Sequence, residues 1–432
     1  MKLLIKNGRL IDPATSTDKV EDILLDNGYI ASWGQVDEDQ EGLQIVDASG
    51  YMVMPGLIDM HVHLRDPGQT WKEDVYSGAA AAAKGGFTTI VAMANTVPVT
   101  DTADKIAAIM KKARETGIHI IQTGSVTLEM EGVHLTDIQE MAAAGFRVIS
   151  EDGKSVMNSG LFKRALAMAA RYNVTVLDHC EDKYLVNGGC VNEDRVSRKE
   201  GLPGITNSVE DSITARDLMI AGDTGAHLHL CHMSTADSVE LLREAKKRGF
   251  KVSGEVTPHH LILTSEDRKP LDTNYKMNPP LRTEKDRQAV VNGLMDGTID
   301  VISTDHAPHR GMEKDTTMVK APFGIVGLET AAPLIWTEFV RTGKMTPLQM
   351  AEKMSWNPAK LLGLERRGSI YPGSEADLII WDPDAFYRID AESFLSKSKN
   401  TPFDGKPVFG QVLMTVCGGE IAYAADKKAG TE

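Results

Sequence analysis

Histidines and aspartates, the residue types that hold divalent metals, close five separate apolar segments of the chain. In one segment, His61 and His63 are two residues apart, so they point to the same side of a predicted strand. The other four segments end on Asp152, His179, His232 and Asp305. Four imidazoles are enough to place two on each of two metal ions. The set therefore predicts a metal centre.

A metal centre of this composition indicates hydrolysis. A divalent metal held by imidazoles and a carboxylate lowers the pKa of bound water toward ~7, and two metals ~3.5–4 Å apart can share one hydroxide. Asp152 is placed to bridge them. Asp305 would accept a proton from the attacking hydroxide and return it to a leaving nitrogen. The chemistry indicated is metal-assisted hydrolysis of an amide-type bond, or its reverse.

Polar residues near the predicted ligands indicate a small anionic substrate. Arg65 lies beside the metal histidines and can clamp a carboxylate with two hydrogen bonds. Asn95, Asn278 and His309 fall in segments expected at the same rim. Each alone would be an ordinary loop residue, so the prediction depends on their being together.

The elements that must position these residues follow the pattern of a parallel (β/α)8 barrel. Eight apolar runs alternate with amphipathic or Ala-rich stretches over about 300 residues. The predicted strands are 56–65, 88–95, 119–126, 147–153, 174–180, 226–233, 251–260 and 300–308. Barrel active sites lie at the C-terminal ends of the strands, which is where the predicted ligands fall.

Alternation along each strand separates predicted ligands from their neighbours. On the fourth strand, Asp152 rather than Glu151 is expected to face the barrel interior. On the sixth strand, His232 is expected to face the interior. His227 and His229 have the opposite parity and are expected to pack behind the barrel.

Both ends of the chain read as short strands with Asn-Gly, Ser-Gly or Gly-Gly turns. They are therefore predicted to meet in one small β-sandwich domain, made of residues 1–52 and 364–432. The barrel would occupy residues 53–363. Its last helix is expected in NPAKLLGL, with Asn357 as the cap and Gly363 as the stop.

Composition excludes several classes of protein. The 432 residues include 61 acidic and 47 basic ones, a net charge of −14, and no Lys/Arg-rich run, which argues against nucleic-acid binding. No apolar run approaches the ~18–20 residues needed to span a membrane. The four cysteines form no CxxC pair, and the start of the chain lacks a secretory signal, so a cytoplasmic location is expected.

Taken together, the motifs resemble the cyclic amidohydrolases of the amidohydrolase superfamily, and among these the bacterial type I dihydroorotases. The resemblance covers nearly the whole chain. The matching segments are PGLIDMHVHLRDPG, AAAKGGFTTIVAMANT, LDHCED, HMST, GEVTPHHL, KMNPPLR, STDHAPH, APFG and SKSKNTPF. It implies a zinc-dependent, reversible cyclisation of N-carbamoyl-L-aspartate to (S)-dihydroorotate with loss of water, the third step of pyrimidine biosynthesis.

The resemblance also implies a role for each site residue. Two zinc ions per subunit would be bound, one by His61 and His63 and the other by His179 and His232. Asp152 would bridge the ions, and Asp305 would be both a ligand and the catalytic acid/base. The residues implied in substrate binding are His63, Arg65, Asn95 and His309 on the carboxylate side, and Asn278, Phe323 and Gly324 on the ring side.

Two positions depart from the usual family pattern. Ala94 replaces a proline, which could loosen the loop that carries Asn95. Glu151 replaces the first aspartate of an Asp-Asp-Gly, but parity and the adjacent Gly153 select Asp152 as the ligand.

Two alternative functions are open at this stage. Hydantoinases, dihydropyrimidinases and allantoinases share the barrel and its histidines, but use a carboxylated lysine as the bridge on the fourth strand. Here Lys154 follows Gly153, at the wrong place for that role. The other alternative is a non-catalytic scaffold partner of aspartate transcarbamoylase, which the intact ligand set disfavours. A homodimer and an association with aspartate transcarbamoylase are further expectations. Residues 310–320 are equally compatible with a lid and with a solvated loop.

Overall fold

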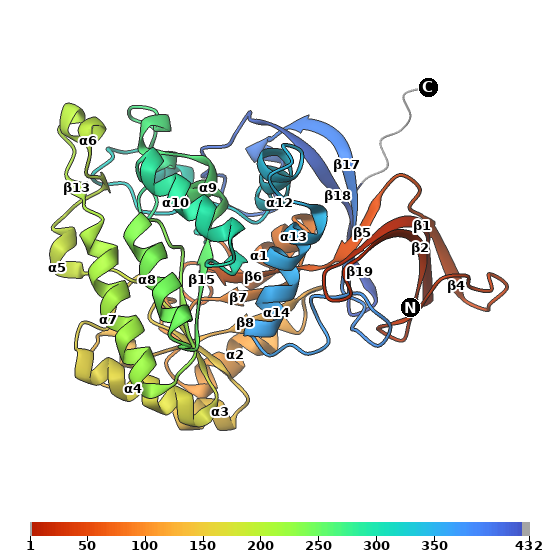
Figure 1. The fold of residues 1–432 in the computed structure, drawn as a ribbon, viewed down its shortest axis with the longest axis horizontal. Coiled ribbons are helices and arrows are strands. Elements are labelled where there is room, and N and C mark those ends of the chain that lie inside the picture. The colour runs from red at the N-terminus through yellow and green to blue at the C-terminus, as the bar shows by residue number, and fades with distance from the viewer. Residues whose placement is uncertain (1, 426–432) are drawn as a thin grey trace.

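The structure is a computed structural model, and it describes residues 2–425. Within them, parallel strands form a central barrel of eight positions (Figure 1). In chain order these are β6 (Leu57–Val62), β7 (Phe87–Ala92), β8 (His119–Gln122) continued by β9 (Gly124–Ser125), β10 (Val148–Ser150), β11 (Thr175–Asp178), β14 (Leu228–Leu230), β15 (Val252–Val256) and β16 (Val301–Ile302). All eight predicted strands are therefore present, each shorter than predicted.

Hydrogen bonds close the barrel between its first and last strands. The ladders run β6-β7-β8 and β9-β10-β11-β14-β15-β16, and β8 is joined to β9 through the single residue Thr123. Val62 pairs in parallel with His306, and the backbone N–H of His63 donates to the carbonyl of His306 at 2.8 Å. The ends of β6 and β16 are thus neighbours.

Helices follow the strands and cover the outside of the barrel (Figure 1). The longer ones are α1 (Val75–Lys84), α2 (Ala103–Ala113), α3 (Ile138–Ala143), α4 (Ser159–Tyr172), α7 (Ser208–Thr224), α8 (Ala236–Lys247) and α10 (Glu284–Met295). Helix α8 is capped by Thr235, whose side chain accepts a hydrogen bond from the backbone N–H of Ser238. Within residues 2–425, no helix is both long enough and apolar enough to cross a membrane.

Short elements fill the connections. They are α5 (Lys183–Val186), α6 (Arg195–Glu200), α9 (Pro258–Ile262), α11 (Gly311–Lys314), α12 (Ala331–Ile335), α13 (Pro347–Ala351), α14 (Asn357–Leu361), β12 (Val191–Asn192), β13 (Gly204–Ile205), η1 (Leu128–Met130), η2 (Ser265–Asp267), η3 (Thr273–Tyr275), η4 (Trp336–Val340), η5 (Glu352–Trp356) and η6 (Ala391–Ser393). The prediction that Asn357 caps the last helix is wrong. Helical turns of α13 and η5 run directly into α14, and the Asn357 side chain donates to the carbonyl of Asp300.

Apolar side chains form separate cores inside and outside the barrel wall. The interior core contains Met60, Val91, Met93, Val148, Leu177, Cys231 and Val301. Leu361 and Leu362, at the end of α14, pack against it. Burying each such large side chain stabilises the fold by roughly 1.5–3 kcal/mol. A larger core lies between the strands and the helices.

On the sixth strand, His232 faces the interior as predicted, but the facing predicted for His229 is wrong. Leu228 and Leu230 pack in the outer core with the helices, whereas Cys231 lies in the interior core. His229 also faces inward, where it contacts Glu255 of β15. The alternation fails because His232 has a φ of 32°, outside the extended range, so its side chain reaches the interior against the parity of the strand.

The two ends of the chain meet in one sheet. Its strands are β1 (Lys2–Asp12), β2 (Thr17–Asp26), β3 (Tyr29–Trp33), β4 (Leu43–Asp47), β5 (Met52–Pro55), β17 (Leu378–Arg388), β18 (Pro407–Cys417) and β19 (Glu420–Ala424). The order is β19-β18-β17-β5-β1-β2-β3, and β4 pairs with β1. Antiparallel pairing of β5 with β17 joins the N-terminal to the C-terminal part. A two-layer sandwich stays a prediction, and residues 426–432 of its C-terminal part lie outside the described residues.

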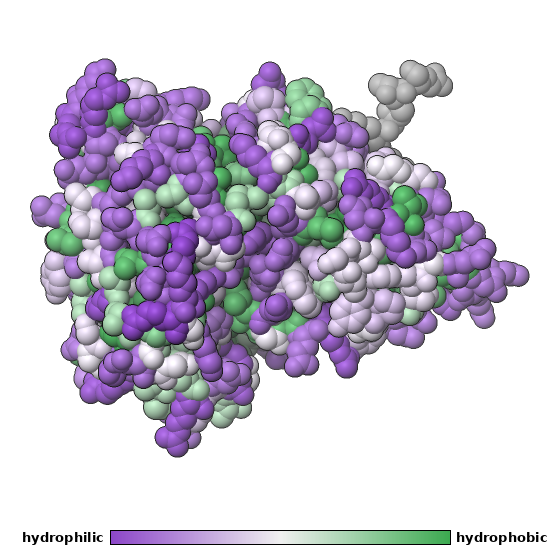
Figure 2. All heavy atoms as spheres, viewed as in Figure 1, coloured by the Kyte–Doolittle hydropathy of each residue, from purple (hydrophilic) through white to green (hydrophobic). Residues whose placement is uncertain are grey.

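One face of the molecule shows how hydrophilic and hydrophobic residues are distributed on the surface. On the face drawn in Figure 2, hydrophilic residues predominate and hydrophobic residues occur in small scattered groups. Single exposed hydrophobic side chains of this kind are normal on a folded protein.

Candidate metal and substrate site

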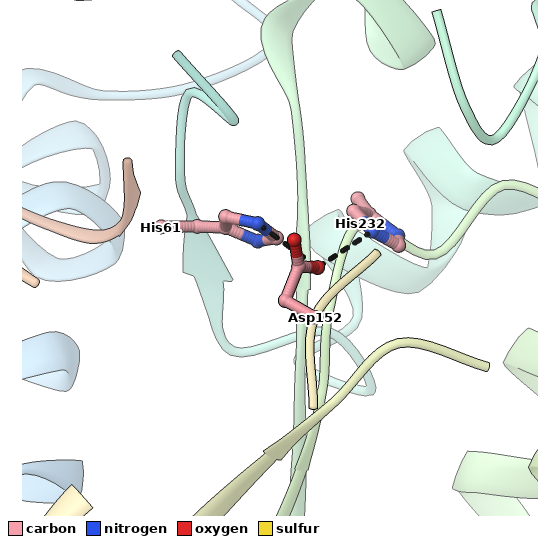
Figure 3. A group of neighbouring side chains, drawn as sticks. All are labelled: His61, Asp152 and His232. Atoms are coloured by element: carbon pink, nitrogen blue, oxygen red, sulfur yellow. Dashed lines mark ion pairs between the residues drawn. The ribbon is translucent and has the colours of Figure 1, made fainter. Parts of the chain in front are cut away.

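Asp152 lies in the middle of the four predicted histidine ligands. Its carboxylate oxygens are 3.2 Å from His61 Nε2, 3.4 Å from His63 Nε2, 3.5 Å from His179 Nδ1 and 3.6 Å from His232 Nε2. Figure 3 shows His61 and His232 on opposite sides of this carboxylate. The structure therefore brings together residues from four barrel strands, and Asp152 has the position that a bridging ligand needs.

Asp305 lies on the side of the first histidine pair. Its Oδ1 is 3.1 Å from His63 Nε2 and 3.5 Å from His61 Nε2. His61, His63 and Asp305 thus form one compact group of possible metal ligands, and His61, Asp152 and His232 form another. All six predicted ligands are buried.

Unpaired polar atoms show that this donor set fits cations. His61 Nε2 and Asp152 Oδ1 are buried, and apart from their mutual 3.2 Å ion pair neither has a hydrogen-bond partner among the residues that the structure describes. Leaving a buried polar atom unpaired costs about 1–3 kcal/mol. A cation between the imidazoles and the carboxylates would satisfy both atoms, and nitrogen and oxygen donors of these types suit zinc.

Partners behind two of the histidines orient their rings. His61 Nδ1 lies 2.8 Å from Oε1 of Glu255, and His63 Nδ1 lies 2.9 Å from Oδ1 of Asn95. Each ring then donates its Nδ1 proton backward and directs the lone pair of Nε2 to the centre. Asn95 also donates to the carbonyl of Asp152 at 3.2 Å, so its loop is tied to the site in the presence of Ala94.

Three residues of the site have left-handed backbones. Arg65, His232 and Asp305 have φ values of 56°, 32° and 48°. Such conformations are costly for residues other than glycine and are concentrated at functional sites. They occur just after β6, β14 and β16, where each turn aims a polar side chain at the centre.

A cavity of about 230 Å³ opens above the ligands. Its lining contains all the predicted site residues except His61, which is fully buried. The lining residues are His63, Arg65, Asn95, Asp152, Gly153, His179, His232, Asn278, Asp305, Ala307, His309, Phe323 and Gly324. The residues predicted for substrate binding are therefore brought together with those predicted for metal binding.

Positive charge gathers on one side of the cavity. Arg65 is half-buried, and its Nε has no hydrogen-bond partner within residues 2–425. His309 Nε2 donates to the carbonyl of Phe323 at 2.8 Å, and Lys72 Nζ lies 3.3 Å from His309 Nδ1. Burial, followed by the charges of Arg65 and Lys72, lowers the pKa of His309 to about 2. This side of the cavity is thus lined by a neutral imidazole and the Arg65 guanidinium, with Lys72 behind them paired to Glu313, and a guanidinium there suits a carboxylate.

Sequence reasoning missed three charged residues around the site. Glu255 backs His61, and Lys72 contacts His309. Glu181 accepts a hydrogen bond from Asn278, and its Oε2 lies 3.7 Å from His179 Nε2. These three residues can be recognised only from their contacts in the folded structure, because their spacing in the sequence is that of ordinary Glu and Lys residues in loops and strands.

The neighbours of Asp152 point elsewhere: Glu151 as its parity predicts, and Lys154 because it follows Gly153. Glu151 accepts hydrogen bonds from the backbone N–H groups of Val126 and Thr127, both at 3.0 Å. Lys154 donates to the carbonyl of Met130 at 3.0 Å. Neither side chain is available as a bridge between the histidines.

Comparison with known proteins agrees with this geometry. The model of the amidohydrolase family matches residues 52–422. The chain belongs to the amidohydrolase family. This confirms the superfamily and the barrel predicted from the sequence. Amidohydrolases are generally metal-dependent, which is consistent with the two candidate ligand groups.

The chain is similar in sequence to proteins named dihydroorotase and in structure to proteins named hydantoinase or dihydropyrimidinase. The chain is 46% identical to the dihydroorotase of Pelotomaculum thermopropionicum over 421 residues, which cover 98% of each chain. It is also 46% identical to the dihydroorotase of Geobacter metallireducens, covering 98% of this chain and 100% of the other. Among solved structures, the L-hydantoinase (dihydropyrimidinase) of Arthrobacter aurescens is similar with a TM-score of 0.88 and 28% identity, covering 98% of this chain and 96% of that one. The dihydropyrimidinase of Brevibacillus agri has a TM-score of 0.86 at 25% identity, covering 100% and 96%.

Proposed function

We propose that this amidohydrolase is a dihydroorotase, which converts N-carbamoyl-L-aspartate reversibly to (S)-dihydroorotate with loss of water in pyrimidine biosynthesis. The observation that carries the proposal is the carboxylate of Asp152 at the centre of four imidazoles. A hydantoinase or allantoinase would need a carboxylated lysine there, and Lys154 is turned away to Met130. Relatives that are 41–46% identical and named dihydroorotase support the same choice.

The metal centre of the proposal holds two zinc ions. His61 and His63 would bind one ion, His179 and His232 the other, Asp152 both, and Asp305 would be a further ligand. When bound, such cations lower the pKa of a coordinated water and polarise a carbonyl group. The unpaired His61 Nε2 and Asp152 Oδ1 support this assignment.

Asp305 would move the proton of the reaction. Burial raises its pKa, but the nearby His61 and His63 outweigh burial, so that the net pKa is lowered and the group is ionised at neutral pH. In cyclisation, the carbamoyl nitrogen forms a bond to the side-chain carboxyl carbon of the substrate, and a C–O bond of that carboxyl group breaks. Asp305 accepts the proton that the nitrogen loses and delivers it to the leaving oxygen, which departs as hydroxide and becomes water by taking up a second proton from the solvent. In hydrolysis the carboxyl group of Asp305 returns the proton to the ring nitrogen.

Arg65 would hold the remaining carboxylate of the substrate, together with Asn95, His309 and His63. The Nε atom of Arg65 is buried and has no hydrogen-bond partner among the described residues, which supports this role. A carboxylate there would pair a charge that is otherwise costly to bury.

Asn278, Phe323 and Gly324 would lie against the ring. The backbone N–H of Gly324 already donates to Lys276, and its carbonyl accepts from Asn400. A Cβ at position 324 would lie 2.6 Å from that of Ala307, and the residue has a φ of 124°. Gly324 would therefore contribute space for the ring, and Phe323 its carbonyl oxygen.

The finer organisation is part of the proposal. We place the barrel at residues 53–363 and a β-sandwich domain in residues 1–52 and 364–432, with β5 and β17 as the junction. We also propose that the protein forms a homodimer, associates with aspartate transcarbamoylase and is located in the cytoplasm. A purely non-catalytic scaffold is not favoured, because all six ligand positions carry their residues at one centre.

A substrate comparison tests the proposed function. Purified protein with bound zinc is assayed with dihydroorotate, hydantoin and dihydrouracil at equal concentrations. We expect turnover of dihydroorotate. Turnover of hydantoin or dihydrouracil alone would show that the assignment is wrong, and no turnover of any of them would favour the scaffold.

A further inference from the structure

A fully buried glutamate connects the two halves of the proposed metal centre. Glu255, on β15, has no exposed surface. Its Oε1 lies 2.8 Å from His61 Nδ1 and accepts from the backbone N–H of His232 at 3.3 Å. His61 and His232 are assigned to different metal ions. One carboxylate oxygen therefore contacts a ligand from each set.

The other oxygen of Glu255 is also held. His229 Nε2 lies 3.2 Å from Oε2, and His229 Nδ1 lies 2.8 Å from the hydroxyl of Ser253. His229 and Ser253 lie on β14 and β15 inside the barrel, below the centre. The carboxylate is thus fixed at both ends, and it cannot rotate away from His61 without breaking the contact to His229.

Through these contacts, Glu255 affects the two proposed ligands in two ways. The bond to Nδ1 of His61 selects the tautomer that leaves Nε2 free for a metal, because a carboxylate accepts the Nδ1 proton. The bond to the backbone of His232 holds a residue with a φ of 32°, which is an unfavourable conformation that its surroundings must maintain. Loss of Glu255 would release both ligands together.

We propose that Glu255 is the positioning residue that couples the two metal sites, by fixing the His61 tautomer and the His232 backbone through one carboxylate. The inference rests on the proposed function only in requiring that the centre binds metal. It assigns no contact between Glu255 and the substrate or the metal. Glutamine at position 255 keeps the shape and one acceptor oxygen for His61 and His232, but it loses the negative charge that strengthens both hydrogen bonds.

Glu73 provides a control of the same residue type, beside His306, the residue that follows Asp305. It is also fully buried and also pairs with an imidazole, at 3.3 Å from His306 Nε2. It contacts Ser77 and Ser396 in addition, and none of the six proposed ligands. Glu73→Gln therefore removes a comparable buried charge without touching His61 or His232.

The test measures metal binding by the apoprotein. Wild type, Glu255→Gln and Glu73→Gln are stripped with a chelator and titrated with zinc in competition with a chromogenic chelator. We expect Glu255→Gln to bind both zinc ions about 10–100-fold more weakly. Glu73→Gln is expected to bind as wild type does. Activity of Glu255→Gln should recover as free zinc is raised, which loss of a purely structural contact would not produce.

Each result has a definite meaning. Zinc affinity of Glu255→Gln within twofold of wild type, an equal loss in Glu73→Gln, or weakening of one zinc ion alone would overturn the inference. Failure of wild type itself to bind zinc would instead overturn the proposed function. If Glu255→Gln does not fold, the tautomer is read in zinc-loaded wild type by ¹⁵N NMR of labelled histidine. A proton on Nδ1 of His61 supports the inference, and a proton on Nε2 overturns it.

Discussion

The Nε2 atom of His63 lies 3.1 Å from Oδ1 of Asp305, although 242 positions separate the two residues in the chain. They meet because β6 and β16 are neighbours where the barrel closes, at the pairing of Val62 with His306. Arg65 lies three residues beyond the end of β6, next to this closure of the barrel. The proposed acid/base and the proposed carboxylate anchor are therefore positioned by one contact between the first and last strands.

Replacing Asp305 by asparagine should remove most of the turnover. Asparagine keeps the size of the side chain but cannot take up a proton, and general acid–base catalysis contributes about 10²–10⁴-fold in rate. We expect kcat to fall by that factor, with the fold and most of the metal retained, as measured by steady-state kinetics, circular dichroism and metal analysis. Asp300→Asn is the control, because Asp300 pairs with Lys246 outside the site. A kcat for Asp305→Asn near that of wild type would contradict the assigned role.

Removing the metal should abolish activity and lower the melting temperature. The six buried ligands bind the cations in the folded state alone, so a metal present at 1,000 times its Kd stabilises the fold by about 4.1 kcal/mol. We expect chelated protein to melt earlier, and zinc to restore both the melting temperature and the turnover. Elemental analysis should give two zinc ions per chain. Full activity in protein shown to be free of metal would rule out the proposed centre.

Replacing Arg65 by lysine should weaken substrate binding more than the chemical step. Lysine keeps the positive charge but offers no planar fork for a carboxylate. One charge-assisted hydrogen bond is worth about 1.5–3 kcal/mol, so KM for dihydroorotate is expected to rise about 10–100-fold. Arg310→Lys is the control, since Arg310 is exposed and its Nε donates to the carbonyl of Trp71. An unchanged KM in Arg65→Lys would exclude Arg65 as the anchor.

His309 should make the fold sensitive to acid. Its pKa is lowered to about 2, by burial first and then by Arg65 and Lys72, whereas a histidine in an unfolded chain has a pKa of about 6.5. Between these values the unfolded chain binds the proton and the folded protein does not, so this residue lowers stability as the pH falls below 6.5. The loss amounts to about 2 kcal/mol at pH 5.

The test for His309 compares wild type with His309→Asn by chemical unfolding at pH 8 and at pH 5. We expect the variant to lose about 2 kcal/mol less than wild type between the two pH values. An equal loss in both proteins would show that the imidazole takes up its proton in the folded state.

The barrel could be predicted from the sequence, and the six proposed ligands could be placed at strand ends, because both depend on local information. Apolar runs of fixed spacing predict strands, and the position of Asp152 after a run places it at a strand end, with Glu151 turned away to Val126 and Thr127 as alternation requires. Alternation assumes an extended backbone, so it failed beside His232, where φ is 32°. Glu255 was not found because its role depends on contacts with β6 and β14, which lie far from it in sequence. Asn357 has the residue type of a cap, but the preceding turns continue the helix through it.

The contact between the terminal sheet and the barrel helices should depend on the absence of a side chain at Gly410. This residue of β18 is buried and has a φ of 89°. A Cβ there would lie 2.2 Å from Trp381 and 2.9 Å from Trp336, whose rings pack against each other. Both indoles are almost fully buried, so neither can move without displacing the core.

Gly410→Ala is therefore expected to cost more than backbone strain alone. A left-handed alanine costs about 1–2 kcal/mol, and overpacking of a core adds about 1–3 kcal/mol. Gly373→Ala separates the two contributions, because Gly373 has a φ of 98° and nothing within 4 Å of its Cβ position. We expect Gly410→Ala to be the less stable of the two by about 1–3 kcal/mol in urea unfolding followed by tryptophan fluorescence. Equal stabilities would mean that the indoles make room for the methyl group, and that the junction is packed more loosely than the distances indicate.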